Sequence, residues 1–352
     1  MNLRKKLLIS IIFCAFGLSS IYSALEYDFE KISLNPIYKE YFADRTRPDM
    51  SITTQFFLEG TPDRVLQETT DNNGVHSVNV FEFGDDFTET GAQTVIKVGE
   101  TVSLARSTFT FDSFLSPIAF DFSFQGMIQS FYTNSFNYGI GYDGIYFFGG
   151  TFRIADVVSM RIGQHHYCSH YGDAIYKLVD KKYGTLDDFN LTYKYIRMNP
   201  YVIGLSIEPT SNFRVYGELN FPGRNIVVLR PFMFGPTWYE RAQNDYGDDY
   251  NARIVNVGFE ISANIFKNLG KTTLGYDLHM YEEGKIYYDH VNGGAIEFRE
   301  DDPWEMEHDV RVAQEIGNSL SIEISYHNGR SPFNNFYFLH TELLGVGLRF
   351  NP

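Results

Sequence analysis

The stretch Phe120-Asp121-Phe122-Ser123-Phe124-Gln125 alternates three large apolar residues with three polar ones. Successive side chains of a β-strand point to opposite faces, so the stretch predicts a strand with one apolar and one polar face. A soluble β-sandwich would bury that apolar face in a dry core, whereas a barrel in a membrane would turn it toward lipid. How often the same pattern recurs along the chain therefore bears on the choice between these two folds.

The period of two recurs toward the C-terminus, in the runs Ile254–Ser262, Thr273–Met280, Ser321–His327 and Leu344–Phe350. Connections between such runs are alternately long and short, apart from a short one at residues 208–211 on the side expected to carry long loops. We therefore predict an all-β fold, a closed antiparallel transmembrane β-barrel of about 12–16 strands, with long extracellular loops and short periplasmic turns. The soluble β-sandwich is the alternative.

The N-terminus resembles an export signal. Arg4, Lys5 and Lys6 precede an apolar run from Leu7 to Leu18, and small residues follow it. This arrangement is typical of a cleaved signal peptide, and the run is too short to cross a bilayer as a helix. A retained anchor is the alternative. We expect a signal peptide at 1–23, a periplasmic segment at 24–50 and the barrel domain at 51–352, located in the bacterial outer membrane.

Composition limits the partners of the chain. Its formal net charge is −15 and its aromatic content is 17%, with 32 Phe and 25 Tyr. A phosphate backbone requires a basic surface, so nucleic acid is not an expected partner. The expected partners are outer-membrane lipid and the barrel-assembly machinery, and the sequence predicts neither a cofactor nor an oligomeric state. Cys168 is the only cysteine beyond the signal segment, which excludes an internal disulfide.

If the apolar faces meet lipid, the opposite faces line the lumen. Eight charged residues on those faces are then expected inside the barrel: Asp121, Arg161, Arg214, Glu218, Glu260, Asp277, Arg311 and Glu323. Both signs are present. The set can pair across the interior and fill it, or it can line a water-filled pore.

Four segments in this order resemble one bacterial family. They are 41–48 (Tyr-Phe-Ala-Asp-Arg-Thr-Arg-Pro), 166–173 (His-Tyr-Cys-Ser-His-Tyr-Gly-Asp), 216–219 (Tyr-Gly-Glu-Leu) and 328–336 (Asn-Gly-Arg-Ser-Pro-Phe-Asn-Asn-Phe). The family is known as domain of unknown function 1207, and the resemblance implies an outer-membrane barrel without an established reaction. The matching positions are Asp44, Arg47, Pro48, His166, Ser169, His170, Gly172, Asp173, Gly329, Ser331 and Pro332. The chain departs from the family at Cys168, where a serine is usual.

The His-rich segment is the candidate for chemistry. On a continuous strand His166, Cys168 and His170 share one face, while Ser169 lies on the other. A histidine two residues from a nucleophile is the arrangement of an outer-membrane phospholipase, in which the imidazole takes the proton of the attacking group. Lipid hydrolysis with Cys168 as nucleophile and Asn328 orienting His166 is therefore one hypothesis.

Two other interpretations of this segment remain open. His165, His166, Cys168, His170 and Asp173 offer nitrogen, sulfur and oxygen ligands that suit Zn²⁺, although their spacing fits no standard zinc motif. Alternatively the segment is architecture at the barrel rim, with a turn at Gly172, a cap at Asp173 and a short helix over residues 174–179. Acidic loop residues offer a further interpretation as Ca²⁺ ligands: Asp245, Asp248, Asp249, Glu300, Asp301 and Asp302. The function predicted from these observations is structural or transport-related and porin-like.

Overall fold

The computed structural model describes residues 25–70, 76–82, 91–112, 115–133, 139–173, 175, 177, 197–221, 253–282, 286–288, 296–298, 304–317, 319–336 and 339–350. The expected signal peptide at 1–23 lies outside them. The described residues are almost entirely β-structure. Within these ranges, no helix has both the length and the hydropathy that crossing a bilayer requires.

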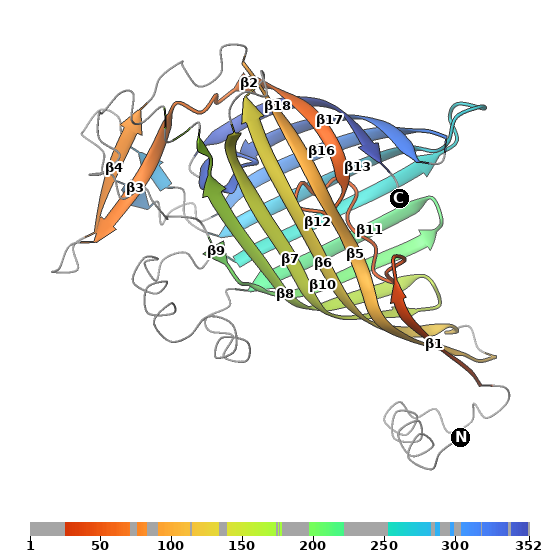
Figure 1. The fold of residues 1–352 in the computed structure, drawn as a ribbon. Coiled ribbons are helices and arrows are strands. Elements are labelled where there is room, and N and C mark those ends of the chain that lie inside the picture. Colours follow the sequence, from red (N-terminus) through yellow and green to blue (C-terminus); the bar gives the residue numbers. More distant parts are fainter. Residues whose placement is uncertain are drawn as a thin grey trace.

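The longer strands form one sheet that closes on itself (Figure 1). They are β2 (Met50–Glu59), β5 (Ala92–Thr110), β6 (Ile118–Thr133), β7 (Gly139–Ile154), β8 (Val158–Tyr171), β10 (Tyr201–Thr210), β11 (Phe213–Phe221), β12 (Arg253–Ala263), β13 (Thr272–Glu282), β16 (Trp304–Ile316), β17 (Leu320–Arg330) and β18 (His340–Phe350). Each pairs with the next in antiparallel fashion, and β18 pairs with β2, also antiparallel, to close the ring. The described residues thus form a barrel of 12 strands, which confirms the predicted fold class.

Shorter elements attach to this ring. β1 (Glu26–Ser33) pairs with the part of β5 that extends beyond β2, and β9 (Arg197–Met198) pairs with β8. Two hairpins lie in long connections: β3 (Arg64–Thr70) with β4 (His76–Glu82), and β14 (Ile286–Tyr288) with β15 (Ile296–Phe298). A 3-10 helix, η3 (Asn334–Phe336), follows β17.

Short and long connections largely alternate around the ring; the exception is β6–β7 (residues 134–138), which is shorter than β5–β6 (residues 111–117) at the other end. The connections β5–β6, β7–β8, β10–β11, β12–β13 and β16–β17 are short and share one end of the barrel, where β1 and the C-terminus also lie (Figure 1). The expected exception at residues 208–211 was wrong, because β9 stays paired with β8 and leads directly into β10. Residues 172–200 are therefore one long connection, and the β10–β11 turn belongs with the short ones.

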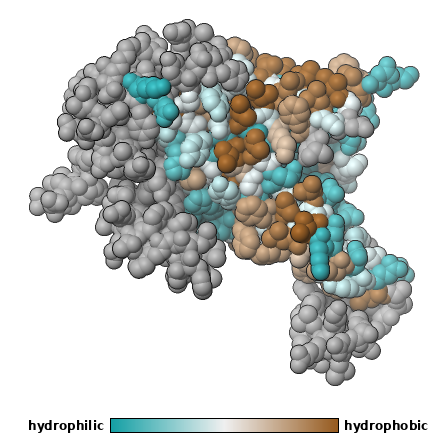
Figure 2. All heavy atoms as spheres, in the orientation of Figure 1, coloured by the Kyte–Doolittle hydropathy of each residue, from teal (hydrophilic) through white to brown (hydrophobic). Residues whose placement is uncertain are grey.

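The two faces of the wall differ as the opening stretch predicts. On β6 the side chains of Phe120, Phe122 and Phe124 are 39%, 41% and 39% exposed, whereas Asp121 and Ser123 are buried. The outward positions of β10 and β18 are likewise apolar, and Figure 2 shows apolar residues gathered over the outer wall. The barrel is therefore apolar outside and polar inside, the reverse of a soluble β-sandwich.

Residues 34–49, which we call the plug, run through the barrel interior between β1 and β2 (Figure 1). Tyr38 and Tyr41 are 2% and 1% exposed, and Arg45 and Arg47 are also buried. This placement differs from the periplasmic segment expected for residues 24–50. The plug can be buried in the lumen because its charges find partners on the inner wall, so burial does not leave them unpaired.

The outward apolar face can be tested at Val346, which is 46% exposed in the middle of β18. Val346→Arg should lower the free energy of unfolding from lipid vesicles by about 2–4 kcal/mol, because the charge would enter hydrocarbon. The control Val346→Leu keeps the face apolar and should change that free energy by less than about 1.5 kcal/mol. Equal unfolding curves for the Arg variant and the wild type would contradict a lipid-facing wall.

Candidate functional site

The plug has no regular secondary structure, so its backbone groups need partners from the wall. Arg214 Nη1 donates to the Glu40 carbonyl at 2.8 Å, and Arg153 Nη1 donates to the Ile37 carbonyl at 3.1 Å. The Phe42 N–H in turn donates to Glu260 Oε1 at 2.6 Å. Side chains from the inner wall thus replace the ladder that a strand would have supplied.

Aromatic and cationic groups stack in the first half of the plug. The Tyr41 ring lies parallel to that of Tyr216 on β11, with centroids 3.9 Å apart. The Arg161 guanidinium lies 5.1 Å from the centroids of both Tyr38 and Tyr41 and pairs with Glu218 at 2.6 Å. Stacking, cation–π contact and a buried ion pair therefore fix this half against β8 and β11.

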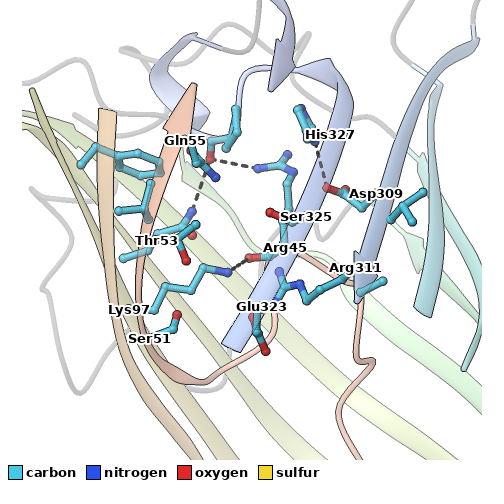
Figure 3. A pocket seen from close by; sticks show the side chains of 16 residues that line it. Arg45, Ser51, Thr53, Gln55, Lys97, Asp309, Arg311, Glu323, Ser325 and His327 are labelled. Atoms are coloured by element: carbon cyan, nitrogen blue, oxygen red, sulfur yellow. Dashed lines mark hydrogen bonds and ion pairs between the residues drawn. The ribbon is translucent and has the colours of Figure 1, made fainter. Parts of the chain in front are cut away.

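Arg45 joins the second half of the plug to three parts of the wall. Its Nε donates to Glu307 Oε1 on β16 at 2.5 Å, its Nη2 to Tyr281 Oη at 3.1 Å, and its Nη1 to the Pro332 carbonyl at 3.0 Å. Lys97 Nζ from β5 donates to the Arg45 carbonyl at 2.5 Å (Figure 3). This one residue therefore contacts opposite sides of the lumen.

Next to Arg45, the plug ends in an ion-pair network. Arg47 Nη2 lies 3.3 Å from both Asp49 Oδ2 and Glu323 Oε1, and Arg311 Nη1 lies 3.4 Å from Asp49 Oδ2 and from Glu323 Oε2. Burial alone would raise the pKa of Asp49, but the cations of Lys97, Arg47 and Arg311 outweigh it and hold that pKa well below its usual range. The Asp49 carboxylate is therefore ionised at neutral pH and holds β16 to the plug through Arg311, while Glu323 holds β17 through Arg47.

A small cavity remains between plug and wall. Its volume is about 40 Å³, and it is lined from β2, β5, β16, β17 and the plug by polar groups that include Gln55, Lys97, Arg311 and Ser325 (Figure 3). A volume of this size holds about two or three water molecules. This cavity is too small for a larger solute.

The eight charged residues expected in the lumen all lie on the inner wall. Six are buried, and Glu260 and Arg311 are partly exposed, with side-chain exposures of 17% and 11%. Several pair with each other or with the plug: Arg161 with Glu218, Arg214 with Glu260, and Arg311 with Glu323. The mixed set therefore packs against the plug and fills the interior instead of lining a wide pore.

The His-rich segment is split between the two faces of β8. His166, Cys168 and His170 share the outer face, as expected, and His165, Tyr167 and Ser169 are buried inside. His166 Nδ1 lies 2.7 Å from Asn199 Oδ1, so Asn199 orients this imidazole in place of the expected Asn328. Cys168 Sγ donates to the Gly144 carbonyl at 3.6 Å. The proposed zinc ligands His165 and His166 therefore point to opposite faces of the strand.

Segments that carry the family resemblance meet near the mouth of the barrel with long connections. Asp143 on β7 accepts from Gln129 Nε2 at 2.8 Å and from the Asn334 N–H at 3.3 Å, and it hydrogen-bonds Ser169. Arg45 reaches Pro332 in the same region. Residues of the segments 41–48, 166–173 and 328–336 are thereby joined through one buried carboxylate and one arginine.

The remaining resemblance positions are structural neighbours of this junction. The Gly172 N–H donates to the Ile140 carbonyl at 2.7 Å, and the described residues Asp173 and Ile175 are helical. Gly329 has φ +152°, and a Cβ there would lie 2.7 Å from the Glu307 backbone. Glycine therefore permits the close approach of β17 to Glu307. Asp44, Arg47, Pro48 and Ser331 are buried, whereas the acidic residues considered for Ca²⁺ lie outside the described residues.

Sequence reasoning missed the residues on which the plug depends most, Arg45, Asp143 and Glu307. Arg45 lies in a segment without periodicity, so no face could be assigned to it. Glu307 and Asp309 do alternate with apolar or outward residues over 304–310, and that spacing could have placed them in the lumen. Their partners, however, come from strands far away in the chain.

Comparison with known proteins gives only distant similarity. No family model and no curated protein matches the chain. Among solved structures, the NanC porin is 8% identical and covers 86% of this chain and 100% of its own, with a TM-score of 0.41. Pseudomonas putida OprB is 8% identical over 92% and 94%, with a TM-score of 0.34, and the Acinetobacter baumannii outer membrane channel DcaP is 7% identical over 94% and 98%, with a TM-score of 0.29. Similarity this low carries no inference about the chain, whose fold follows from its own strand pairing.

The plug network predicts a pH dependence. Because the folded-state pKa of Asp49 is depressed, its stabilising contribution is complete above its unfolded pKa of about 3.9 and is lost as the pH falls below that value. At pH 7 the variant Asp49→Asn should unfold with about 2 kcal/mol less free energy than the wild type. Denaturant titrations from pH 7 to pH 3 should show this difference shrinking, and a difference that is independent of pH would contradict the assignment.

Proposed function

We propose that the chain is an outer-membrane channel for small solutes whose conductance is limited by its own plug. The observation that carries this proposal is the plug itself, a charged segment that occupies the lumen of a barrel with an apolar outer wall. An apolar outer wall and a polar interior are what a membrane-spanning barrel needs, because lipid offers no hydrogen-bond partners.

The chain's organisation supports this location and orientation. An export-signal pattern precedes the barrel, and the short turns share one end with β1 and the C-terminus. In outer-membrane barrels the short turns face the periplasm and the long loops face outward. The plug would then enter from the periplasmic end, with outer-membrane lipid around the wall and the barrel-assembly machinery as the partner that inserts it.

The composition of the plug favours a movable element. Residues 34–49 contain Lys39, Arg45 and Arg47 against Glu40, Asp44 and Asp49, so their charges sum to zero. A neutral but highly polar segment exchanges ion pairs for water at modest cost, since the desolvation penalty of its buried charges is recovered on leaving the lumen. Its withdrawal would leave the inward charges of the wall in contact with solution.

Resemblance to domain of unknown function 1207 fits the same proposal. Of the four segments that carry the resemblance, 41–48 lies in the plug, 216–219 and 328–336 contact it, and 166–173 is joined to 328–336 through Asp143. We propose that these positions preserve the attachment of the plug to the wall, and that the family shares a plugged barrel.

Planar-bilayer recordings test the channel directly. Wild-type protein should open rarely, because the plug fills the lumen. Deletion of residues 25–49 should give frequent and larger conductance steps. Arg45→Ala removes three hydrogen bonds to the wall and should raise the open probability at least several-fold.

The matched control is Lys39→Ala. This cation is also in the plug and paired with Glu208, but its side chain is 55% exposed, so its loss should leave the open probability within about twofold of wild type. Deletion protein that remains closed would contradict the channel, and wild-type protein with steady large conductance would contradict the plug.

A second candidate function is hydrolysis of a lipid ester on the outer face of β8. The observation that favours it is the 2.7 Å contact between His166 Nδ1 and Asn199 Oδ1. If the Nδ1 proton is donated to the amide oxygen, Nε2 is unprotonated and can take a proton from a thiol. The Cys168 thiolate would attack the ester carbonyl, the protonated imidazole would return that proton to the leaving alcohol, and water would cleave the thioester.

This candidate predicts release of fatty acid from phospholipid vesicles by the folded protein. Cys168→Ala and His166→Ala should each reduce the rate by about 10²-fold or more. Ser169→Ala should retain the rate, because Ser169 is buried on the inner face. Activity that survives both of the first two substitutions would exclude this chemistry.

A further inference from the structure

We propose that His279, Glu307 and Asp309, on the inner wall beside the plug, bind a divalent cation of the first transition-metal row, such as Mn²⁺ or Zn²⁺. His279 lies on β13, and Glu307 and Asp309 lie two residues apart on β16. The three are 6%, 0% and 7% exposed. One nitrogen or oxygen ligand atom from each lies within 4.8 Å of the other two. This cluster is separate from the His-rich segment considered from the sequence.

Strand register brings the ligands together. His279 is directly opposite Glu307, and Asp277 is directly opposite Asp309. All four side chains are buried on the same face of two adjacent strands. Like charges placed opposite each other in a sheet repel, so the Asp277–Asp309 pair costs stability unless a positive charge lies close by. A bound cation would supply such a charge.

Each proposed ligand has one atom held by a neighbour, and the second oxygen of each of the two carboxylates lacks a partner. Glu307 Oε1 accepts from Arg45, Asp309 Oδ1 lies 3.0 Å from His327 Nδ1, and His279 Nε2 lies 3.1 Å from Asn256 Nδ2. Glu307 Oε2 and Asp309 Oδ2 are buried without a hydrogen-bond partner, and the contact of His279 Nδ1 is with Asp277. Outer contacts that orient a ligand while leaving its other atom unpaired are typical of metal sites.

Asp277 extends the same pattern. Its Oδ2 accepts from Tyr216 Oη at 2.7 Å, and its Oδ1 lies 2.8 Å from His279 Nδ1. Asp277 Oδ1 is thus close enough to serve as a fourth ligand. Asn256 Oδ1 is also unpartnered, and a turned amide would let it accept from Nε2–H when Nδ1 binds metal.

The charges of the cluster require further compensation. Asp277, Glu307 and Asp309 contribute three negative charges, Arg45 supplies one positive charge at Glu307, and the imidazoles of His279 and His327 lie beside Asp277 and Asp309. With both imidazoles neutral, two negative charges remain, which a divalent cation would neutralise. Asp44, whose Oδ1 is 3.8 Å from His279 Nε2, adds to the negative potential. Buried carboxylates at this density are otherwise expensive to ionise.

The donor set indicates which cations fit. One imidazole with two or three carboxylates suits Mn²⁺ and Zn²⁺ better than Ca²⁺, which prefers oxygen ligands alone. Two ligands of a tetrahedral Zn²⁺ at about 2.1 Å lie roughly 3.4 Å apart, so the side chains must close by up to about 1.4 Å from their separations of up to 4.8 Å. Rotamer adjustments of this size are available to glutamate and aspartate side chains.

Metal binding to the folded full-length protein tests the proposal. Equilibrium dialysis with Zn²⁺ and with Mn²⁺, followed by elemental analysis, should give one ion per chain. His279→Ala and Asp309→Asn should each weaken binding at least 10-fold. The matched control is His308→Ala, because His308 lies between two of the ligands on β16 but on the outer face, where it contacts Tyr276, and binding should be unchanged.

A measurement on the wild-type protein keeps the test independent of how the variants fold. Pulsed electron paramagnetic resonance of bound Mn²⁺ should show coupling to one imidazole nitrogen. Absence of a stoichiometric ion, or an ion without nitrogen coupling, would overturn the proposal. So would equal losses of binding in His308→Ala and His279→Ala, because the outer histidine would then matter as much as the inner one. The channel proposal is tested separately by conductance, and neither result decides the other.

Discussion

The structure depends on one constraint: a wall that presents apolar side chains outward leaves its polar side chains no partners but each other and the plug. Groups such as Arg161, Glu218 and Asp277 are buried from solvent, so each needs a counter-group in the lumen. The plug supplies many of these groups. Its three cations and three anions interleave with the wall charges, and its tyrosines cover the aliphatic and guanidinium surfaces between them. Removal of the plug would therefore leave charged groups of the inner wall without their partners.

Two kinds of residue in the lumen behave differently under this constraint. Arg45, Arg47 and Asp49 lie in nearly complete pairs, which hold strands from several sides of the ring together. Around His279, by contrast, anionic groups outnumber cationic ones and several buried atoms lack partners. Unpartnered buried atoms that gather beside an excess of carboxylates are explained by the cation proposed above.

Much of the fold follows from the period of two. The alternation at Phe120–Gln125 assigns both faces of β6, and the same rule places the eight charged lumen residues on the inner wall. It could also have assigned the His-rich segment, because His165 and Ser169 are an even number of residues from the inward Arg161. The plug could not be predicted in this way. It has no periodicity, and its position is fixed by pairs such as Arg45–Glu307 that are 262 residues apart.

The pairing of β1 and β2 with the same edge of β5 has a consequence for how the plug can move. β2 occupies Ala92–Val98 and β1 occupies Ser103–Thr110, so the plug is a loop tethered to one strand at both of its ends. A loop anchored in this way can leave the lumen only as a bend, through the opening next to its two anchors. Its departure would break the contacts of Arg47 and Asp49 with β16 and β17 but would leave the β2–β18 seam paired. The wall can thus stay a closed cylinder while its interior changes.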